Sequence, residues 1–233
     1  LDIPDYDLSL GEFPVYKAAN FQANRQGYFH YCIVGNSYNG GGSSGLAEIH
    51  GDDFVVTVGG WPATGDNNYV GNTLMHELGH NLNLRHGGFQ NRNYKPNYNS
   101  VMSYAYQLCG VDADGNLSPD GVLDYSWGVN IALDESSLDE AAGVTGSGPV
   151  IDWNENGLSD KSLVSRNINC PWAVWCVGGL STQDCGTAGN CADSSCNILL
   201  DNDDWGTLSL LGISEGLIAP EVVTCMSNPS LNP

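Results

Sequence analysis

Residues 73–86, TLMHELGHNLNLRH, contain the strongest pattern in this 233-residue chain. Three leucines recur at every fourth residue, starting at Leu74, which is the spacing of one face of an α-helix. No proline interrupts the stretch, and Asn72 or Thr73 is suited to cap its N-terminus. The stretch therefore predicts an amphipathic helix over residues 73–83.

Three of the five histidines of the chain lie in this stretch. His76 and His80 are four residues apart, so a helix places both imidazoles on one face. Glu77 points about 100° further around the helix, where it flanks a metal without binding it. His86 reaches the same metal only if the chain turns back after the helix. Asn83 suits that turn, because Asn tolerates the left-handed backbone conformation.

This histidine spacing predicts a catalytic zinc site. Three neutral nitrogen ligands with one open position are typical of such a site, whereas a structural site is closed by a fourth protein ligand. Zinc lowers the pKa of a bound water from about 15.7 to about 7. We therefore expect one zinc ion on His76, His80 and His86, with Glu77 as the general base that takes a proton from the attacking water.

The stretch resembles the long zinc-binding motif of the metzincin metallopeptidases, HExxHxxGxxH, with Asn83 in place of the usual Gly. SVMSY at residues 100–104 is similar to the Met-turn of that family, in the form found in its astacin and serralysin branches. The resemblance implies that Met102 is the structural methionine beneath the metal. It also implies that Tyr104 is a displaceable zinc ligand whose hydroxyl stabilises the oxyanion. The resemblance is specific over residues 73–106.

The resemblance implies an α+β fold with a metzincin-like catalytic domain. Its expected parts are a twisted mixed sheet, an active-site helix and a loop-rich, disulfide-containing C-terminal subdomain. Residues 45–49 would be the edge strand of the sheet, along which a substrate peptide lies antiparallel. The implied function is a zinc-dependent endopeptidase. Two alternatives stay open: a zinc hydrolase of non-peptide amides, and an inactive binding module stabilised by zinc.

The residues before the helix predict strands. Residues 28–34 alternate large side chains, residues 45–49 follow a Gly/Ser/Asn loop and predict a short second strand, and residues 53–58 are a β-branched run typical of a buried strand. His30 and His50 lie in or beside these strands, and we expect neither to be a metal ligand. Strands followed by a helix and a loop-rich remainder indicate the α+β class.

The remainder of the chain predicts one more helix and a division into two parts. We expect a helix over residues 137–142, where Ser137 and Glu140 match a capping box. We expect one catalytic domain with an N-terminal subdomain, residues 1–86, that holds the sheet and the zinc-binding helix. A C-terminal subdomain, residues 87–233, would hold the Met-turn, the acidic loops and the cysteine-rich segment.

Two acidic stretches suggest calcium sites. Residues 152–160 carry oxygen-bearing side chains at alternate positions and then a glycine, like the first nine positions of an EF-hand loop. The candidate calcium ligands are Asp152, Asn154, Asn156, Leu158 and Asp160. The twelfth position is Leu163 instead of the bidentate Glu, so further ligands must come from elsewhere. A poorer candidate set is Asp112, Asp114, Asn116 and Asp120. The alternative for both stretches is a solvated turn rich in Asx residues.

Charge and cysteine content restrict the partners and the environment. The chain has 27 Asp and Glu against 7 Lys and Arg, a net charge of −20, which argues against nucleic-acid or anionic-membrane binding. No apolar run reaches the roughly 18 residues of a membrane span. Five of the eight cysteines fall within residues 170–196 without a CxxC pair, which favours disulfides over a zinc knuckle. We expect a secreted monomer that acts on peptides or proteins.

Overall fold

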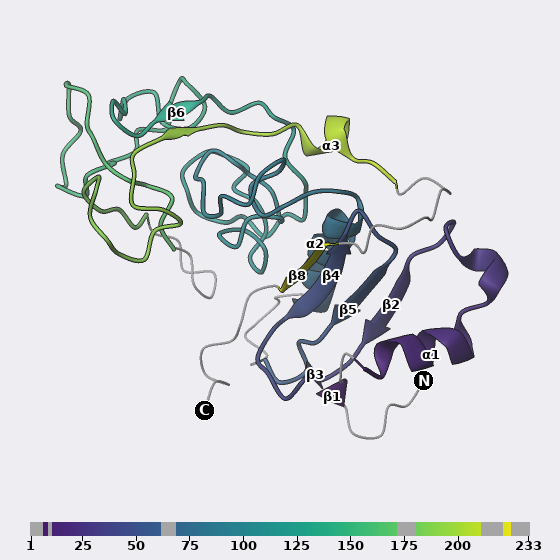
Figure 1. Cartoon of the computed structure of the whole chain (residues 1–233). Helices are drawn as coiled ribbons and strands as arrows, with labels where there is room; N and C mark the ends of the chain where they lie inside the picture. Colours follow the sequence, from purple (N-terminus) through teal and green to yellow (C-terminus); the bar gives the residue numbers. More distant parts are fainter. Residues whose placement is uncertain (1–6, 9–10, 62–68, 172–179, 211–220, 225–233) are drawn as a thin grey trace. The chain divides into compact units, whose positions relative to one another are not determined.

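The computed structural model forms two compact units. It describes all residues except 1–6, 9–10, 62–68, 172–179, 211–220 and 225–233. Unit 1 comprises Leu1–Leu84 and Leu208–Pro233, and unit 2 comprises Arg85–Thr207. The described residues 208–210 and 221–224 thus belong to the unit that contains the predicted helix and strands. The chain has a mixed α+β architecture with a small mixed sheet and few helices (Figure 1).

The main sheet of unit 1 has four strands in the order β2-β5-β4-β8 (Figure 1). Their bounds are Tyr31–Val34 for β2, Gly45–Ile49 for β4, Asp53–Val56 for β5 and Glu221–Thr224 for β8. β2 is parallel to β5, whereas β4 is antiparallel to both β5 and β8. The three strands predicted from sequence are confirmed, two of them as shorter elements. A second sheet pairs β1 (Asp7–Leu8) with β3 (Ser37–Tyr38) in parallel.

The expectation that β4 is an edge strand is wrong in this structure. β8 pairs with β4 over four residues, from Leu46 opposite Thr224 to Ile49 opposite Glu221. β8 belongs to the far C-terminal part of the chain, and no turn signal or alternation in the sequence connects it with β4. A pairing between residues so distant in sequence depends on tertiary folding, so local pattern does not predict it.

One face of the sheet carries a small apolar cluster. Ile33, Leu46 and Val55, from three adjacent strands, are buried together. Helix α1 (Phe13–Asn20) supplies Phe13 and Tyr16, which pack against this cluster. Pro14 stands in the first turn of α1, where its missing N–H costs nothing because the first helical N–H groups have no partner in the helix. A short 3₁₀ helix, η1 (Ala23–Arg25), follows α1.

Helix α2 (Tyr69–Asn81) packs against β4 and β5 (Figure 1). The predicted helix is confirmed, although it begins four residues before the expected start at Thr73. At its C-terminal end the buried side chain of Asn81 donates from Nδ2 to the carbonyl oxygens of Glu48 (2.8 Å) and Asp53 (3.0 Å). Its Oδ1 accepts from Nδ1 of His30 at 3.0 Å. One side chain thus joins α2 to two strands.

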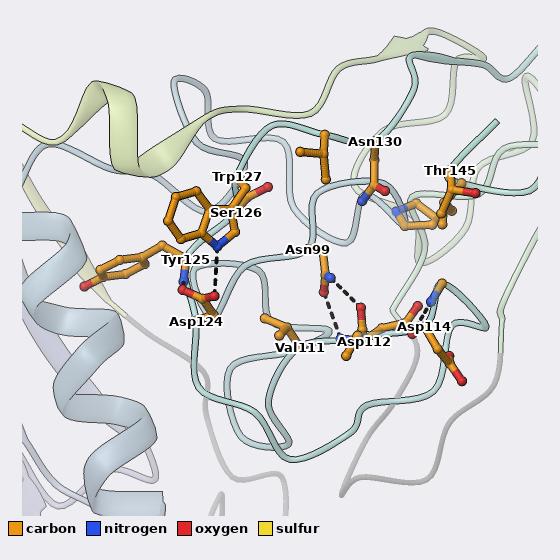
Figure 2. A pocket seen from close by; sticks show the side chains of 15 residues that line it. Asn99, Val111, Asp112, Asp114, Asp124, Tyr125, Ser126, Trp127, Asn130 and Thr145 are labelled. Carbon is orange, nitrogen blue, oxygen red and sulfur yellow. Dashed lines mark hydrogen bonds between the residues drawn. The ribbon is translucent and has the colours of Figure 1, made fainter. Parts of the chain in front are cut away.

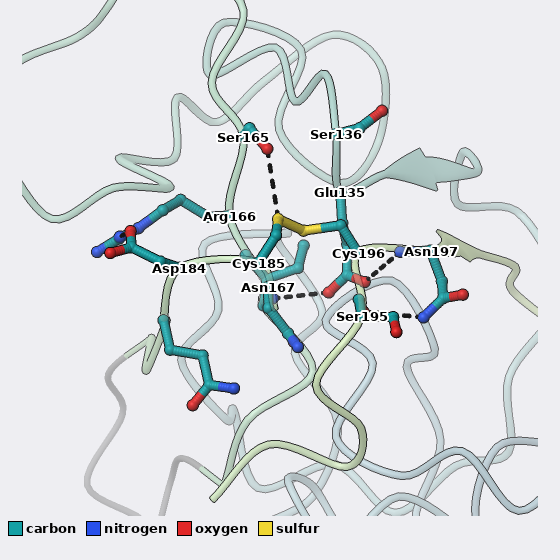
Figure 3. The surroundings of a disulfide bond; sticks show 12 residues. Glu135, Ser136, Ser165, Arg166, Asn167, Asp184, Cys185, Ser195, Cys196 and Asn197 are labelled. Atoms are coloured by element: carbon teal, nitrogen blue, oxygen red, sulfur yellow. Dashed lines mark hydrogen bonds and ion pairs between the residues drawn. A yellow bond between two sulfur atoms is a disulfide. The ribbon is translucent and has the colours of Figure 1, made fainter. Parts of the chain in front are cut away.

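Unit 2 consists mostly of loops held by polar contacts and disulfides. β6 (Leu133–Asp134) pairs antiparallel with β7 (Ile198–Leu199), and α3 covers only Asp204–Thr207. Disulfides join Cys170 to Cys191 and Cys185 to Cys196. Figure 3 shows the carboxylate of Glu135 beside the second disulfide, where it accepts from the backbone N–H of Asn197 at 2.8 Å. Cys176 lies outside the described residues.

The predicted helix over residues 137–142 is wrong, because the segment consists of a bend, an isolated bridge from Leu138 to Val164, and turns. Glu140 is fully buried, and its carboxylate accepts backbone N–H groups of Trp153 (3.0 Å) and Asp160 (2.7 Å). The backbone N–H of Ser137 donates to the carbonyl oxygen of Asp134 instead of starting a helix. The Glu of the apparent capping box therefore stabilises a distant loop. Among the described helices, none combines the length and apolar character required to span a bilayer.

Candidate metal centre

Three buried imidazoles form the centre of the candidate site. His76 and His80 are fully buried, and His86 is 8% exposed. Each offers one ring nitrogen, and these nitrogens all lie within 4.8 Å of one another. A zinc ion bound at about 2.1 Å by three nitrogens keeps them roughly 3.4 Å apart. The histidine group could therefore hold a metal ion after small side-chain rotations.

The hydrogen bonding of His80 determines which of its ring nitrogens could bind a cation. Nδ1 of His80 lies 2.8 Å from the carbonyl oxygen of Leu84, which can only accept, so Nδ1 carries the proton. Nε2 of the neutral ring then carries a lone pair, and it lies 3.1 Å from Nε2 of His76. Two ring nitrogens at this distance repel each other unless a proton or a metal cation lies between them. Nitrogen ligands of this kind suit zinc, and the Leu84 contact orients the ring as outer-shell partners do.

The turn after α2 has the geometry that the sequence predicts. Asn83 adopts a left-handed conformation with φ 76°. The N–H of Asn83 donates to the carbonyl oxygen of His80 at 2.9 Å. The N–H of Leu84 donates to the carbonyl oxygen of Gly79, also at 2.9 Å. These two bonds make a Schellman motif with Asn83 as the left-handed residue. The motif ends the helix and reverses the chain two residues before His86, which confirms the role assigned to Asn83.

A tight loop follows the turn and carries His86. The backbone groups of Arg85 and Gly88 are paired in both directions, at 2.7 and 2.9 Å. Gly88 has φ 79°, and a Cβ at this position would lie 2.5 Å from Cβ of Asn202. His86 therefore lies in a loop whose backbone is fixed on both sides.

Glu77 is fully buried and lies against β4. A Cβ placed on Gly45, the first residue of β4, would lie only 2.1 Å from Oε1 of Glu77 and 2.7 Å from the carbonyl oxygen of Val55. Only glycine allows this approach. Burial, together with the charge of Glu77, raises the pKa of the Cys32 thiol to about 12, so this thiol stays protonated. Gly45 was not predicted as a site residue, although a glycine within a strand is a usual sign of close approach.

Met102 and the surrounding turn are pinned by a buried carboxylate. Met102 is fully buried, and its N–H donates to Oγ of Ser100 at 3.2 Å. That hydroxyl donates in turn to Oδ2 of Asp204 at 2.6 Å. Asp204 also accepts from the hydroxyl of Tyr98 at 2.9 Å and from Nδ2 of Asn202 at 2.7 Å. This network fixes residues 100–102 from a residue far away in sequence, which local pattern does not reveal.

Tyr104 lies beside the third histidine. Its ring centroid is 4.4 Å from that of His86, with 52° between the planes, and 5.9 Å from that of Tyr94. The backbone N–H of Tyr104 donates to Oδ1 of Asn93 at 3.0 Å. The structure thus places two residues assigned to the site, Tyr104 and His86, in direct contact.

One of the two acidic stretches brings its carboxylates together. Three carboxylate oxygens, one from each of Asp112, Asp114 and Asp120, lie within 4.8 Å of one another. Asp112 accepts backbone N–H groups of its own loop, and burial raises its pKa. Beside this group is a cavity of about 200 Å³ (Figure 2), lined also by Trp127, whose indole N–H donates to Asp124 at 3.0 Å.

The EF-hand-like stretch uses its oxygens within its own loop. Nδ2 of Asn154 and Nδ2 of Asn156 donate to Oδ2 of Asp160, at 2.8 and 2.9 Å. Oδ2 of Asp152 accepts from the N–H of Gly157 at 2.7 Å. Leu158, the fifth predicted residue, has an exposed side chain. The loop has the Asx-turn hydrogen bonds of the alternative interpretation.

A third acidic group, which was not predicted from the sequence, lies in unit 1. Carboxylate oxygens of Glu48, Asp52 and Asp53 lie within 4.8 Å of one another. Nζ of Lys17, from α1, is 3.2 Å from Asp52 and 2.6 Å from Asp53. Burial raises the pKa of Asp53 to about 6, although Lys17 acts in the opposite direction. The ion pairs join α1 to the start of β5.

Comparisons with protein-family models, with curated proteins and with solved structures gave no match to this chain.

Proposed function

We propose that this chain is a secreted zinc-dependent endopeptidase with a metzincin-like site. The observation that carries the proposal is the buried group of His76, His80 and His86, whose ring nitrogens lie within 4.8 Å of one another. The residue that follows the first histidine, Glu77, is buried as well. Three nitrogen ligands and a neighbouring carboxylate are the components of hydrolytic zinc enzymes.

The proposed chemistry assigns a separate task to each side chain. The three histidines would hold a zinc ion, which supplies Lewis acidity and activates a water. Glu77 would take the proton of that water and then pass it to the leaving amine. The hydroxyl of Tyr104 would donate to the developing oxyanion, and loss of such a donor costs about 3 kcal/mol of transition-state stabilisation. Met102 would have a structural role only.

The variant Glu77→Gln tests the general base. We expect it to keep one zinc per chain and to lose about 100-fold or more in casein digestion, because its amide cannot accept the proton. Digestion by the parent should stop with 1,10-phenanthroline. The control is Glu12→Gln, which changes an exposed carboxylate outside every proposed site. Near-parent digestion by Glu77→Gln would remove Glu77 from this role, and a parent without zinc would end the proposal.

The two alternatives predict different results in the same assays. A hydrolase of non-peptide amides would bind zinc and leave casein intact, while it cleaves a panel of small amides. An inactive module would bind zinc, melt at a lower temperature without it, and hydrolyse neither substrate. The burial of Glu77 beside Gly45 favours a catalytic role, because a structural zinc site does not require a buried carboxylate that binds no metal.

We propose calcium as a second, stabilising ion, bound at residues 152–160 or at the group of Asp112, Asp114 and Asp120. Neutralising carboxylates would favour the compact state of a chain with net charge −20. We expect EGTA to lower the melting temperature and added calcium to restore it. Asp120→Asn should weaken the response if the second group is the site. A melting temperature that EGTA leaves unchanged would exclude a stabilising calcium ion.

The disulfides and the charge support the remaining parts of the proposal. Cys170–Cys191 and Cys185–Cys196 are the bonds of a protein that folds in an oxidising environment, which favours secretion. The net charge of −20 favours neutral or basic peptides as substrates, and it disfavours nucleic acid or an anionic membrane as a partner. We expect the active species to be a monomer.

A further inference from the structure

The outer edge of β4 is occupied by the chain itself. β8 lies antiparallel to β4, with Ala47 opposite Val223 and Glu48 opposite Val222. β8 pairs with no other strand among the described residues, whereas β5 is paired on both of its sides. Figure 1 shows β8 at the end of the sheet, beside β4. The strand thus depends on one ladder of four residue pairs.

This edge runs toward the proposed general base. β4 begins at Gly45, whose backbone approaches the carboxylate of Glu77 so closely that a Cβ would lie 2.1 Å from Oε1. The adjacent residue of β4, Leu46, is opposite Thr224, the last residue of β8. β8 therefore covers the edge to within one residue of the point where β4 contacts Glu77.

An extended peptide would need the same backbone groups that β8 uses. Adding a strand to a sheet edge is a common way for proteins to bind peptides, and main-chain hydrogen bonds supply much of the affinity. Each N–H and C=O on the outer side of β4 can serve only one neighbouring strand. β8 and an added peptide therefore exclude each other. A short strand paired on one side opens at a lower free energy than the whole unit.

We propose that β8 (Glu221–Thr224) is a built-in competitor of peptide ligands for the edge of β4. Opening of β8 exposes an edge that takes an extended peptide antiparallel to β4 and carries it past Glu77. The inference rests on the proposed function in one respect: if the chain is a peptidase, the paired form is the less active one. The proposed competition between β8 and a peptide for the edge of β4 does not require the chain to be an enzyme.

The test weakens the β4–β8 ladder with proline. Adjacent residues of a strand direct their N–H groups to opposite sides, so one of two consecutive prolines must face β4. The variant is Val222→Pro/Val223→Pro, and its matched control is Val222→Thr/Val223→Thr, which keeps both N–H groups. All proteins also carry Glu77→Gln, so that the probe stays intact. The probe is fluorescent acetyl-Glu-Val-Val-Thr-amide, a copy of β8.

We expect the proline variant to bind the probe at least tenfold more tightly than the threonine control. Equal binding by the two variants would overturn the inference. Hydrogen exchange on the parent chain covers the case in which the proline variant fails to fold. With excess probe, the amides of residues 221–224 should lose protection while those of residues 46–49 keep it. Protection retained at residues 221–224 would contradict the proposal.

Casein digestion with an intact Glu77 separates this inference from the proposed function. A proline variant that digests casein faster than the threonine control supports both. If neither variant digests casein although the probe binding differs, the peptidase proposal fails and the competition between β8 and the peptide stands. If the proline variant and the threonine control digest casein at the same rate and bind the probe equally, the peptidase proposal stands and β8 is only a structural strand.

Discussion

At the scale of single residues, Gly45 and Asn83 determine the geometry around the histidines. The missing side chain of Gly45 lets the first residue of β4 lie against the carboxylate of Glu77. Asn83 takes φ 76° and ends α2 with a Schellman motif, so that His86 comes back toward His76 and His80. Neither residue has a chemical role of its own. Both act through backbone conformation, one by leaving space and the other by adopting a conformation that most residues avoid.

Gly45→Ala tests the close approach. We expect the variant to lose about 1–3 kcal/mol of unfolding free energy, because the new Cβ would lie 2.1 Å from Oε1 of Glu77 and 2.7 Å from the backbone of Val55. We also expect casein digestion to fall at least tenfold, since Glu77 must move. Gly41→Ala is the control, because its nearest contact would be an ordinary 3.4 Å. Urea denaturation and zinc content are the measurements, and an unaffected Gly45→Ala would contradict the packing described.

At the scale of elements, the attachment of α2 to the sheet depends on polar contacts. The Asn81 amide donates to backbone carbonyls at Glu48 and Asp53, which belong to two adjacent strands, and accepts from His30. Oδ1 of Asn81 can only accept, so the proton of His30 is on Nδ1. These contacts set the position of the helix that carries His76 and His80 relative to β4. His30 thus helps to hold the C-terminal end of α2.

Asn81→Ala should loosen the C-terminal end of α2. The variant leaves two partly buried carbonyl oxygens and one imidazole N–H without this partner, which we expect to cost about 3 kcal/mol. Asn20→Ala is the matched control, because Asn20 makes one exposed bond to the carbonyl of Tyr16 within α1. Chemical denaturation measures both variants. A loss for Asn81→Ala no larger than that for Asn20→Ala would show that packing alone holds the helix.

At the scale of the whole molecule, the dominant property is an excess of carboxylates. The net charge is −20, and the group of Glu48, Asp52 and Asp53 meets one cation, Lys17. Burial raises the pKa of Asp53 to about 6. The folded chain therefore binds a proton at Asp53 at pH values where the unfolded chain has already released it. Such a group stabilises the fold at low pH and loses that contribution as the pH rises to about 6.

Asp53→Asn should change the pH dependence of stability in a definite direction. In the parent, we expect the contribution of Asp53 to unfolding free energy to fall as the pH rises from about 4 to about 6. Asn stays neutral throughout, so the variant should lack that fall, and the stability difference between the two proteins should vary across this window. Urea denaturation at several pH values from 4 to 7 measures it. A constant difference would mean that Asp53 titrates normally in the folded chain.

The sequence by itself determined the local features: α2 over most of its length, the strands β2, β4 and β5, the reversal at Asn83, and the spacing of His76, His80 and His86. These features depend on helical period, side-chain alternation and single-residue backbone preference, all of which act over a few residues. Tertiary structure decided what depends on distant residues. It paired β8 with β4, joined the buried Asp204 to Ser100, and used Glu140 to hold a loop instead of capping a helix. Contacts between residues far apart in the chain leave no periodic signal, because each partner satisfies its hydrogen bonds only after the chain has folded.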